Sequence, residues 1–396
     1  MSLTISSVLD SNFYRVANPD LAGLNDAQAL SHFQARGINE GRLFSPLISL
    51  SFYRSSNSDL ANLNNNQLLN HVVNHGIAEG RIFSPIVNLD YYRERNNDIA
   101  SFNNEQLFTH LKNSGISEGR VFSPIFNFGY YKSPNSDLAS LNNSQLLNHF
   151  VINGINEGRK FSSYFEFDYY RSNNRDLANF SNNQLLNHFT IYGIDEGRKS
   201  SSAFDAGYYK RNNPDLATLR GFNLIDHFGR FGILEGRQAT NDYAGNTFAT
   251  ARQITIGANY THIFEHVGTS DAYDYYRFDL NQASNIRLDN VSFSRSVIEQ
   301  VLDSRGNILS SRNTAVRGSS ANPVQNLQLS PGTYYIRIQP QQGNTIYSLW
   351  LSTNNNSGST LEQLLLEAQL QAELLEIMRR GYSNLLDISR GLINAV

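Results

Sequence analysis

The 396-residue chain contains no cysteine, one tryptophan and two methionines, and only 17% of its residues are charged. The absence of cysteine excludes disulfide bonds, thiolate catalysis and zinc sites with cysteine ligands. A net charge of only −3 gives no reason to expect nucleic acid or an anionic membrane as a partner. No apolar run approaches the ~20 residues that a transmembrane helix needs. The first residues lack the basic and apolar regions of a cleavable signal, so we expect none.

One motif recurs through the first two thirds of the chain. The string "HFVINGINEGR" at 149–159 is one of six closely related copies, which are spaced 39 residues apart without an insertion. The repeated histidines are His32, His71, His110, His149, His188 and His227, and the repeated arginines are Arg42, Arg81, Arg120, Arg159, Arg198 and Arg237. A catalytic group is needed once, whereas a structural unit is needed in every copy. We therefore interpret these residues as structural.

The fourth copy predicts two helices and a short turn. Ser123 and Pro124 are typical of a helix N-cap and first helical position, followed by a short aromatic helix. Asn142 and Gln145 have the spacing of a capping box that opens the second helix. Gly154 is expected to end that helix in the left-handed conformation.

One such unit cannot bury its apolar face alone, so neighbouring units must stack. The sequence therefore predicts an all-α solenoid over residues 4–237. Its units span about 4–42, 43–81, 82–120, 121–159, 160–198 and 199–237.

The repeated histidines also suggest a ladder of metal sites. Packed helices lie about 8–10 Å apart, whereas histidine ligands lie roughly 2.0–2.1 Å from a shared zinc. Equivalent histidines are therefore expected to be too far apart, and half-buried histidines bonded to backbone or carboxylate are favoured. Glu157 and Arg159 are predicted to join adjacent repeats through charge-assisted hydrogen bonds. A ligand groove along the stack is the alternative, but near-identical repeats favour a spacer or polymer.

These units resemble the tandem "NPDLA…HF…GxxEGR" repeats of large bacterial exoproteins, whose role is mostly unknown. The resemblance spans Asp10 to Arg237.

After a linker at 238–247 the pattern changes to short aliphatic and aromatic segments separated by turns such as "DSRGN" and "SPGT". The predicted strands are "RQITIG", "THIFEHVG", "YDYYRFDL", "SNIRLDNVS", "VIEQVLD", "NILSS", "VQNLQLS", "TYYIRIQ" and "IYSLWLS". Strands at this spacing indicate an antiparallel β-sandwich over 248–352.

Residues 241–352 also resemble the bacterial pre-peptidase C-terminal domain, through "NDYAGNTFATA", "VGTSDAYDYYRFDL", "VLDSRGNIL" and "LSPGTYYIRI". The resemblance implies a non-catalytic, jelly-roll-like sandwich appended to secreted enzymes and surface proteins. Some relatives hold calcium with side chains from the linker and an early strand. By resemblance the candidate calcium ligands are Asn241, Asp242, Asp271 and Asp274. The alternative is a polar turn with solvated carboxylates, because calcium takes six to eight oxygens and this linker lacks the glutamates of the strongest calcium-binding relatives.

Two further segments carry predictions. His262 and His266 share one face of a predicted strand, and without an evident third ligand they are interpreted as a surface pair. A linker at 353–359 precedes amphipathic C-terminal helices at 360–396. These helices are expected to dock on this chain, to pair with another copy, or to act as an uncleaved C-terminal signal for type I secretion.

No nucleophile elbow, zincin helix or phosphate-binding loop is present, so the sequence predicts that the protein is not an enzyme. We expect a secreted or cell-surface structural protein that self-assembles into an extracellular fibre, sheath or layer. The alternative is a calcium-dependent adhesive module that binds polysaccharide or protein, with the solenoid as spacer. An unrecognised hydrolase is the least favoured function.

Overall fold

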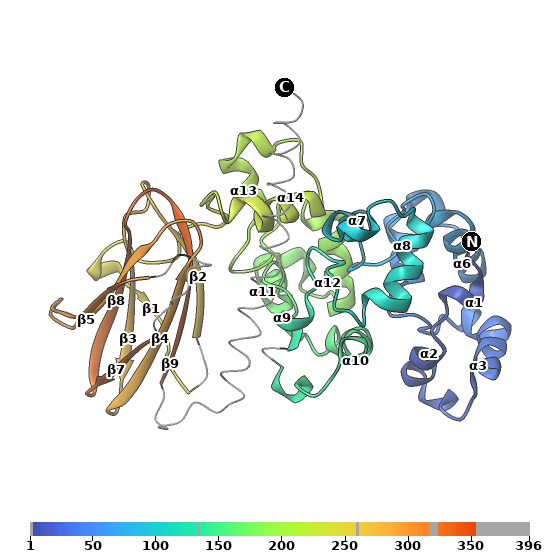
Figure 1. Ribbon diagram of the computed structural model, residues 1–396, viewed down its shortest axis with the longest axis horizontal. Coiled ribbons are helices and arrows are strands. Elements are labelled where there is room, and N and C mark those ends of the chain that lie inside the picture. The colour runs from blue at the N-terminus through green and yellow to red at the C-terminus, as the bar shows by residue number, and fades with distance from the viewer. Residues whose placement is uncertain (1–2, 133–134, 259–260, 315, 317–323, 354–396) are drawn as a thin grey trace. The chain divides into compact units, whose positions relative to one another are not determined.

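The computed structural model describes residues 3–132, 135–258, 261–314, 316 and 324–353. The chain forms two compact units, and the boundary between them in the sequence falls between Ser200 and Ser201. Helices occupy the first unit and the start of the second, and strands follow (Figure 1). Within the described ranges no helix is long and apolar enough to cross a membrane. The predicted C-terminal helices at 360–396, and all but the first residue of the linker before them, lie outside the described residues.

Each repeat contains a first helix with a 3₁₀ turn, then a second helix that continues into a π-helical turn. The first helices are α2 (Ser11–Ala17), α5 (Leu50–Ser56), α7 (Leu89–Arg95), α9 (Phe128–Lys132), α11 (Phe167–Asn173) and α13 (Ala206–Asn212). The 3₁₀ turns are Pro19–Leu21, Ser58–Leu60, Asn97–Ile99, Ser136–Leu138, Arg175–Leu177 and Pro214–Leu216. The second helices are α3 (Asp26–His32), α6 (Asn65–His71), α8 (Asn104–His110), α10 (Asn143–His149), α12 (Asn182–His188) and α14 (Phe222–His227). The π-helical turns are Phe33–Gly37, Val72–Gly76, Leu111–Gly115, Phe150–Gly154, Phe189–Gly193 and Phe228–Gly232. The first repeat adds α1 (Ile5–Val8) and α4 (Ile38–Glu40).

Local capping explains where the helices begin. The predicted capping box is confirmed, since the backbone N–H of Gln145 donates to Asn142 Oδ1 and that of Asn142 donates to Gln145 Oε1, both at 3.0 Å. The predicted start at Ser123 is wrong. The Ser123 hydroxyl accepts from the backbone of Phe126 (3.0 Å) and forms a turn, whereas the helix is capped by Asn127, which accepts from Tyr130 N at 2.8 Å. An asparagine side chain that reaches the third residue decides the start.

The two glycines of the repeat motif have different roles. The left-handed residue is Gly158, with φ of 68°, and the prediction that assigned this role to Gly154 is wrong. Gly154 is needed because a Cβ there would lie 2.1 Å from the hydroxyl oxygen of Tyr131. The tyrosine occupies the space that a side chain would take.

That tyrosine is the hydrogen-bond partner of the repeated histidine. The hydroxyl of Tyr131 lies 2.8 Å from Nδ1 of His149, which is half-buried. The other five pairs are Tyr14–His32, Tyr53–His71, Tyr92–His110, Tyr170–His188 and Tyr209–His227, at 2.7–3.0 Å. The expected partner was a backbone group or a carboxylate, and the structure gives a tyrosine hydroxyl instead. Burial raises the pKa of Tyr53 to about 12, so the phenol stays protonated at neutral pH.

The repeated arginine forms its ion pairs within its own repeat. Arg159 donates from Nη1 to Asp137 Oδ1 (2.7 Å) and from Nε to Glu157, and all three residues belong to the same unit. The prediction that these groups join adjacent repeats is therefore wrong. The arginine holds the pKa of the Asp137 carboxyl below its usual range. The equivalent pairs are Arg42–Asp20, Arg81–Asp59, Arg120–Asp98, Arg198–Asp176 and Arg237–Asp215.

Adjacent repeats are joined through backbone groups instead. The backbone N–H of Ser49 donates to Phe83 O at 3.1 Å, and Asn65 Nδ2 donates to Ile38 O at 3.1 Å. In the first unit, repeats two positions apart also touch. Lys112 Nζ donates to Ser7 O at 2.6 Å, and Thr190 Oγ1 donates to Pro85 O at 3.4 Å. Both pairs are separated by 105 residues, so the same stacking step recurs.

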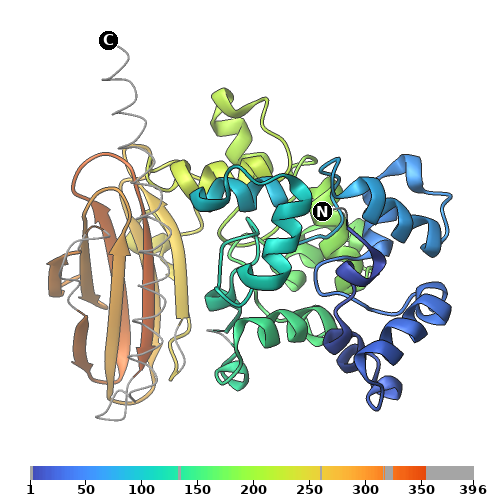
Figure 2. The same ribbon diagram turned by 45° about the vertical axis from the view of Figure 1, so that its right-hand side comes forward.

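All nine predicted strands are present. They are β1 (Arg252–Gln253), β2 (Thr261–Val267), β3 (Asp274–Leu280), β4 (Ser284–Ser292), β5 (Val297–Asp303), β6 (Ile308–Asn313), β7 (Gln325–Leu329), β8 (Gly332–Pro340) and β9 (Thr345–Thr353). They form sheets of order β1-β3-β8-β5-β6 and β2-β9-β4-β7, drawn in yellow to red in Figures 1 and 2. The pairing is antiparallel except between β1 and β3, which are parallel, so the first sheet is mixed.

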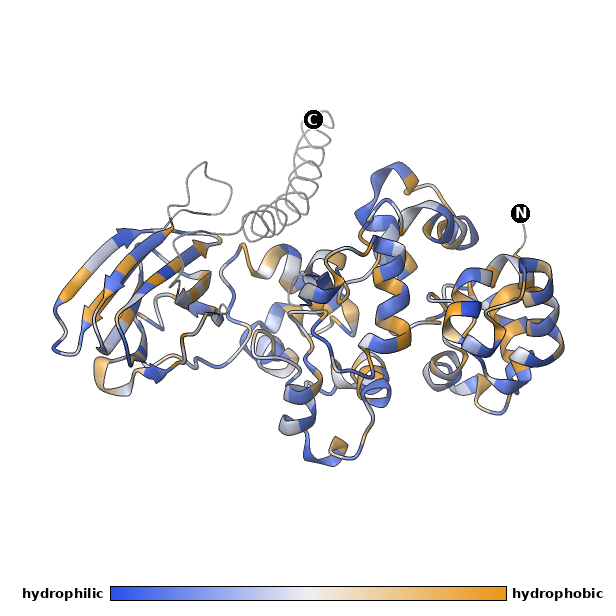
Figure 3. Cartoon of the chain, turned by 90° about the horizontal axis from the view of Figure 1, so that it is seen from below, coloured by the Kyte–Doolittle hydropathy of each residue, from blue (hydrophilic) through white to orange (hydrophobic). Residues whose placement is uncertain are grey.

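One hydrophobic cluster takes side chains from both sheets, including Phe278 and Ile336 from one and Leu288 and Leu349 from the other. Polar and apolar residues alternate along the strands, as the banded colouring of Figure 3 shows. This period of two places every second side chain in the shared core.

We predict that Gly154→Ala weakens the repeats. The added methyl must displace the Tyr131 hydroxyl from His149, which is expected to lower the free energy of unfolding by about 1–3 kcal/mol. Gly23→Ala is the matched control, because a Cβ at Gly23 has no atom within 4 Å. Chemical unfolding followed by circular dichroism measures both variants. Equal midpoints would contradict the close packing of tyrosine on glycine.

Candidate metal centre

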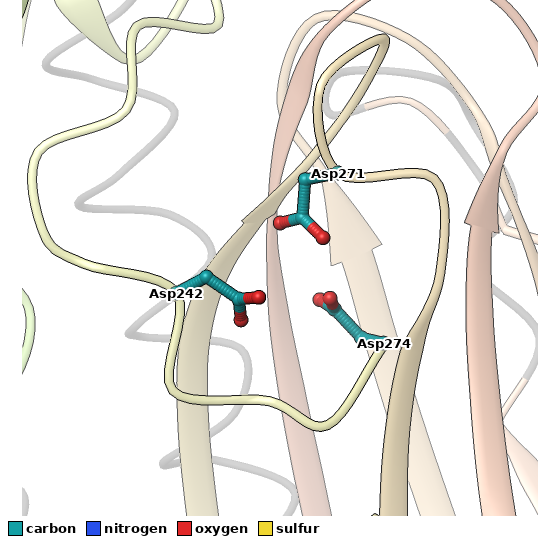
Figure 4. Close-up of side chains that lie close together, drawn as sticks. All are labelled: Asp242, Asp271 and Asp274. Atoms are coloured by element: carbon teal, nitrogen blue, oxygen red, sulfur yellow. The ribbon is translucent and has the colours of Figure 1, made fainter. Parts of the chain in front are cut away.

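Three aspartates from two segments converge in the second unit. Asp242 lies in the segment after the sixth repeat, Asp271 in the turn between β2 and β3, and Asp274 at the start of β3. Their nearest carboxylate oxygens all lie within 4.8 Å of one another, and the side chains point inward (Figure 4). Asp271 is 5% exposed and Asp274 is fully buried. Asn241, the fourth predicted ligand, is exposed.

Local structure fixes the turn that carries Asp271. Gly268 and Asp271 exchange two backbone hydrogen bonds, of 2.7 and 3.2 Å. Asn344, between β8 and β9, accepts from the Thr269 backbone at 2.9 Å and holds the turn from the other side. A Cβ at Gly268 would lie 2.1 Å from Asn344 Oδ1, so only glycine fits there.

Two tyrosines hold Asp274 from within the core. Asp274 Oδ2 accepts a short hydrogen bond from the Tyr347 hydroxyl, which lies 2.6 Å from the hydroxyl of Tyr276 on the other sheet. Because Tyr347 donates to the carboxylate, Tyr276 is the donor to Tyr347. This series of hydrogen bonds holds Oδ2 of Asp274 in place and leaves Oδ1 directed at the neighbouring aspartates.

The centre has more acidic oxygen than hydrogen-bond donors. Four buried oxygens have no hydrogen-bond partner in the described part of the chain, namely Asp242 Oδ1, Asp271 Oδ1, Asp271 Oδ2 and Asp274 Oδ1. Buried polar atoms are almost always satisfied, by protein, water or an ion. Oxygen-only, carboxylate-rich sets are those that Ca²⁺ prefers. The three side chains therefore fit a hard cation, with backbone oxygens or water completing its shell.

Burial and repulsion from neighbouring carboxylates raise the pKa of Asp274 and Asp242. The pKa of Asp274 is raised well above its usual value by burial, then by the charges of Asp271 and Glu265. Burial and the charge of Asp271 raise the pKa of Asp242. Without a cation the centre therefore keeps protons that isolated aspartates would lose.

Two residues beside the centre are not among the ligands predicted from the sequence. Glu265, on the core side of β2, is 4% exposed, and burial raises its pKa to about 8. His266 is 4% exposed, with Nδ1 3.9 Å from Asp271 Oδ2, so its assignment to a surface pair is wrong. The other member, His262, is exposed and stacks on Trp350 at 3.8 Å. Glu265 and His266 are adjacent in "FEHVG", and their burial depends on which segments pack against the two faces of the strand. The order of residues along the strand does not reveal those neighbours.

No family model and no curated protein matches this chain. Among solved structures it is similar to the pre-peptidase C-terminal domain of collagenase from Bacillus anthracis, with 19% identity and a TM-score of 0.22, over 26% of this chain and 93% of that chain. It is also similar to PliG from Salmonella Typhimurium, a periplasmic lysozyme inhibitor, with 14% identity and a TM-score of 0.20, over 26% of this chain and all of that chain. A third structure is the carbohydrate-binding module CBM36 in complex with calcium and xylotriose, with 16% identity and a TM-score of 0.18, over 25% of this chain and 90% of that chain. Each match covers about a quarter of this chain and leaves its family unassigned.

We predict that, in the presence of a chelator, the second unit becomes less stable as the pH rises from 5 to 8. A carboxyl group whose pKa is higher in the folded protein than in the unfolded chain stabilises the fold. This stabilisation is complete at a pH below the pKa of the unfolded chain, and it is lost as the pH rises through the pKa of the folded protein. For Glu265 that value is about 8. Scanning calorimetry should show the midpoint falling over this range.

Glu265→Gln should flatten the pH profile, because the amide has no proton to lose. A wild-type midpoint that is constant or rises between pH 5 and 8 would contradict the raised pKa values.

Proposed function

We propose that this protein is a non-enzymatic, secreted or cell-surface module in which Ca²⁺ fixes the last repeat to the β region. In this proposal the repeats form an α-solenoid and the two sheets form a jelly-roll-like β-sandwich. The observation that carries it is the set of four unpartnered, buried carboxylate oxygens, contributed by a segment after the last repeat and by the sheet. The extracellular location rests on the sequence resemblance to the pre-peptidase C-terminal domain.

The ligand set favours calcium over other divalent cations. Zinc prefers nitrogen and sulfur ligands, whereas the group contains three carboxylates. Magnesium requires near-ideal octahedral geometry and keeps several waters, while calcium accepts irregular shells of six to eight oxygens. Three carboxylates from two segments provide at most six oxygens in an irregular arrangement, and this suits calcium.

The acidic centre also lies close enough to the last repeat to act on it electrostatically. Tyr208, on α13, has its pKa raised by burial and by the negative charges of Asp242 and Asp271. A Cβ at Gly236, where the sixth repeat ends, would lie 2.6 Å from the backbone oxygen of Asn344. Asn344 also holds the turn of Asp271. A cation at the aspartates would therefore tie the segment after the repeat to the turn on which the repeat rests.

We predict that calcium raises the unfolding midpoint of the second unit, and that Asp274→Asn removes this effect. A ligand at one hundred times its Kd adds about 2.7 kcal/mol to the free energy of unfolding. Asp279→Asn, on the same strand but at the surface, is the matched control and should keep the calcium response. Differential scanning calorimetry in calcium and in chelator measures both.

In chelator, Asp274→Asn should be at least as stable as the wild type at pH 8, because the amide removes a repelled charge. That result separates loss of the cation from loss of the fold. A calcium response retained in Asp274→Asn would overturn the proposed centre.

One observation favours self-assembly as a second function. The contact between repeats two apart recurs at the same 105-residue spacing in the first unit. Stacking of this head-to-tail kind has no built-in end, so a second copy can continue it. We therefore keep the prediction of a fibre, sheath or layer as a proposal.

Electron microscopy of the full-length protein tests this second function, in calcium and in chelator. Ordered fibres or sheets would support it. Dispersed particles in both conditions, at concentrations well above micromolar, would contradict it.

A further inference from the structure

The outer face of the sheet β1-β3-β8-β5-β6 carries a row of linked polar side chains. Tyr275, Arg337 and Gln300 occupy paired positions on β3, β8 and β5, and Gln300 is paired with Ser311 on β6. Arg337 donates to the Tyr275 hydroxyl at 3.3 Å and from Nε to Gln300 Oε1 at 2.7 Å. Gln300 Nε2 donates to Ser311 Oγ at 3.1 Å. The row crosses four strands and holds the guanidinium in one orientation.

Aromatic rings surround this row. The ring of Tyr273, 41% exposed, lies 6.3 Å from that of Tyr275, and the guanidinium of Arg337 lies over both, at 5.8 and 6.0 Å. On the other side, Phe248 stacks on Tyr335 at 3.8 Å and presents its edge to Tyr275. We refer to these five residues, Tyr273, Tyr275, Phe248, Tyr335 and Arg337, as the aromatic face.

In the part of the chain that the structure describes, no carboxylate forms an ion pair with the Arg337 guanidinium of the aromatic face. The neighbouring Arg277 pairs with Asp279 at 3.3 Å, whereas the described hydrogen bonds of Arg337 go to neutral oxygens. A guanidinium has five N–H donors, and Arg337 uses three of them on Tyr275 and Gln300. The remaining N–H groups belong to a planar fork that suits a carboxylate.

We propose that the aromatic face binds an acidic polysaccharide. The apolar faces of successive sugar rings would cover Tyr273 and Tyr275, and a uronate carboxylate would meet Arg337. Rigid aromatic platforms with a few fixed polar groups are typical of ligand sites. The charge of Arg337 favours an acidic sugar over a neutral one, and the polar row supplies groups for sugar hydroxyls.

This proposal rests in part on the proposed function, because Tyr273 lies between two residues of the metal centre. Asp271 and Asp274 flank it in the sequence, so a cation that fixes their turn also fixes the tyrosine ring. Arg337 is held by the sheet and does not depend on the cation. Variants of Tyr273 and Arg337 therefore distinguish the proposed metal centre from the proposed glycan site.

Calorimetric titration of the full-length protein with oligogalacturonate, in calcium, tests the proposal. Binding should exceed that of a neutral glucan of equal length, and Arg337→Met and Tyr273→Ala should each lower affinity at least about tenfold. The matched controls are Arg305→Met in an exposed turn and Tyr192→Ala, whose side chain is 51% exposed in the fifth repeat. Both should bind as the wild type does.

The outcomes distinguish the two proposals. Arg337→Met should keep the calcium-induced rise in unfolding midpoint while losing affinity for the acidic glycan, which also shows that the variant is folded. If glycan binding persists without any calcium response, the metal centre fails and the aromatic face stands. Equal binding of neutral and acidic glycans, or no binding of either, would overturn the proposal. Retention on a protein matrix alone would also overturn it.

Discussion

Buried carboxylates that face one another repel, and the region around Asp271 and Asp274 is organised by that repulsion. Water is excluded from both side chains, so solvent screens their charges poorly. Either protonation or a bound cation relieves the repulsion. The raised pKa values of Asp242, Asp274 and Glu265 show that protonation is favoured when no cation is bound. Buried carboxylate oxygens without donors therefore suit the proposed cation site, because an unpaired buried charge is costly.

In the proposed function, the same centre joins two kinds of architecture. Asp242 follows the last repeat, while Asp271 and Asp274 belong to the β region. Tyr347 and Tyr276 connect the centre to the core between the sheets. On the outer surface, Tyr273 connects it to the aromatic face. The proposed cation site and the proposed binding surface therefore share the segment of residues 271–274.

The repeats use a different principle. Each repeat is held together internally by the ion pairs of its arginine and by the tyrosine that packs against a glycine. Neighbouring units are then joined by backbone–backbone hydrogen bonds and by side chains, such as that of Asn65, that donate to backbone carbonyls. This division explains how the motif tolerates variation elsewhere while its glycine, tyrosine, histidine and arginine recur in every copy.

The sequence alone determined the elements. Short aliphatic and aromatic segments separated by turns mark all nine strands, and the Asn142–Gln145 spacing marks a helix start, because both depend on neighbours along the chain. It also brought Asp242, Asp271 and Asp274 together through a family resemblance. It did not identify the tyrosine partner of His149, the role of Gly154, the repeat to which Arg159 binds, or the burial of Glu265 and His266. Those depend on which distant side chain fills a given space, and only the packed tertiary structure decides that.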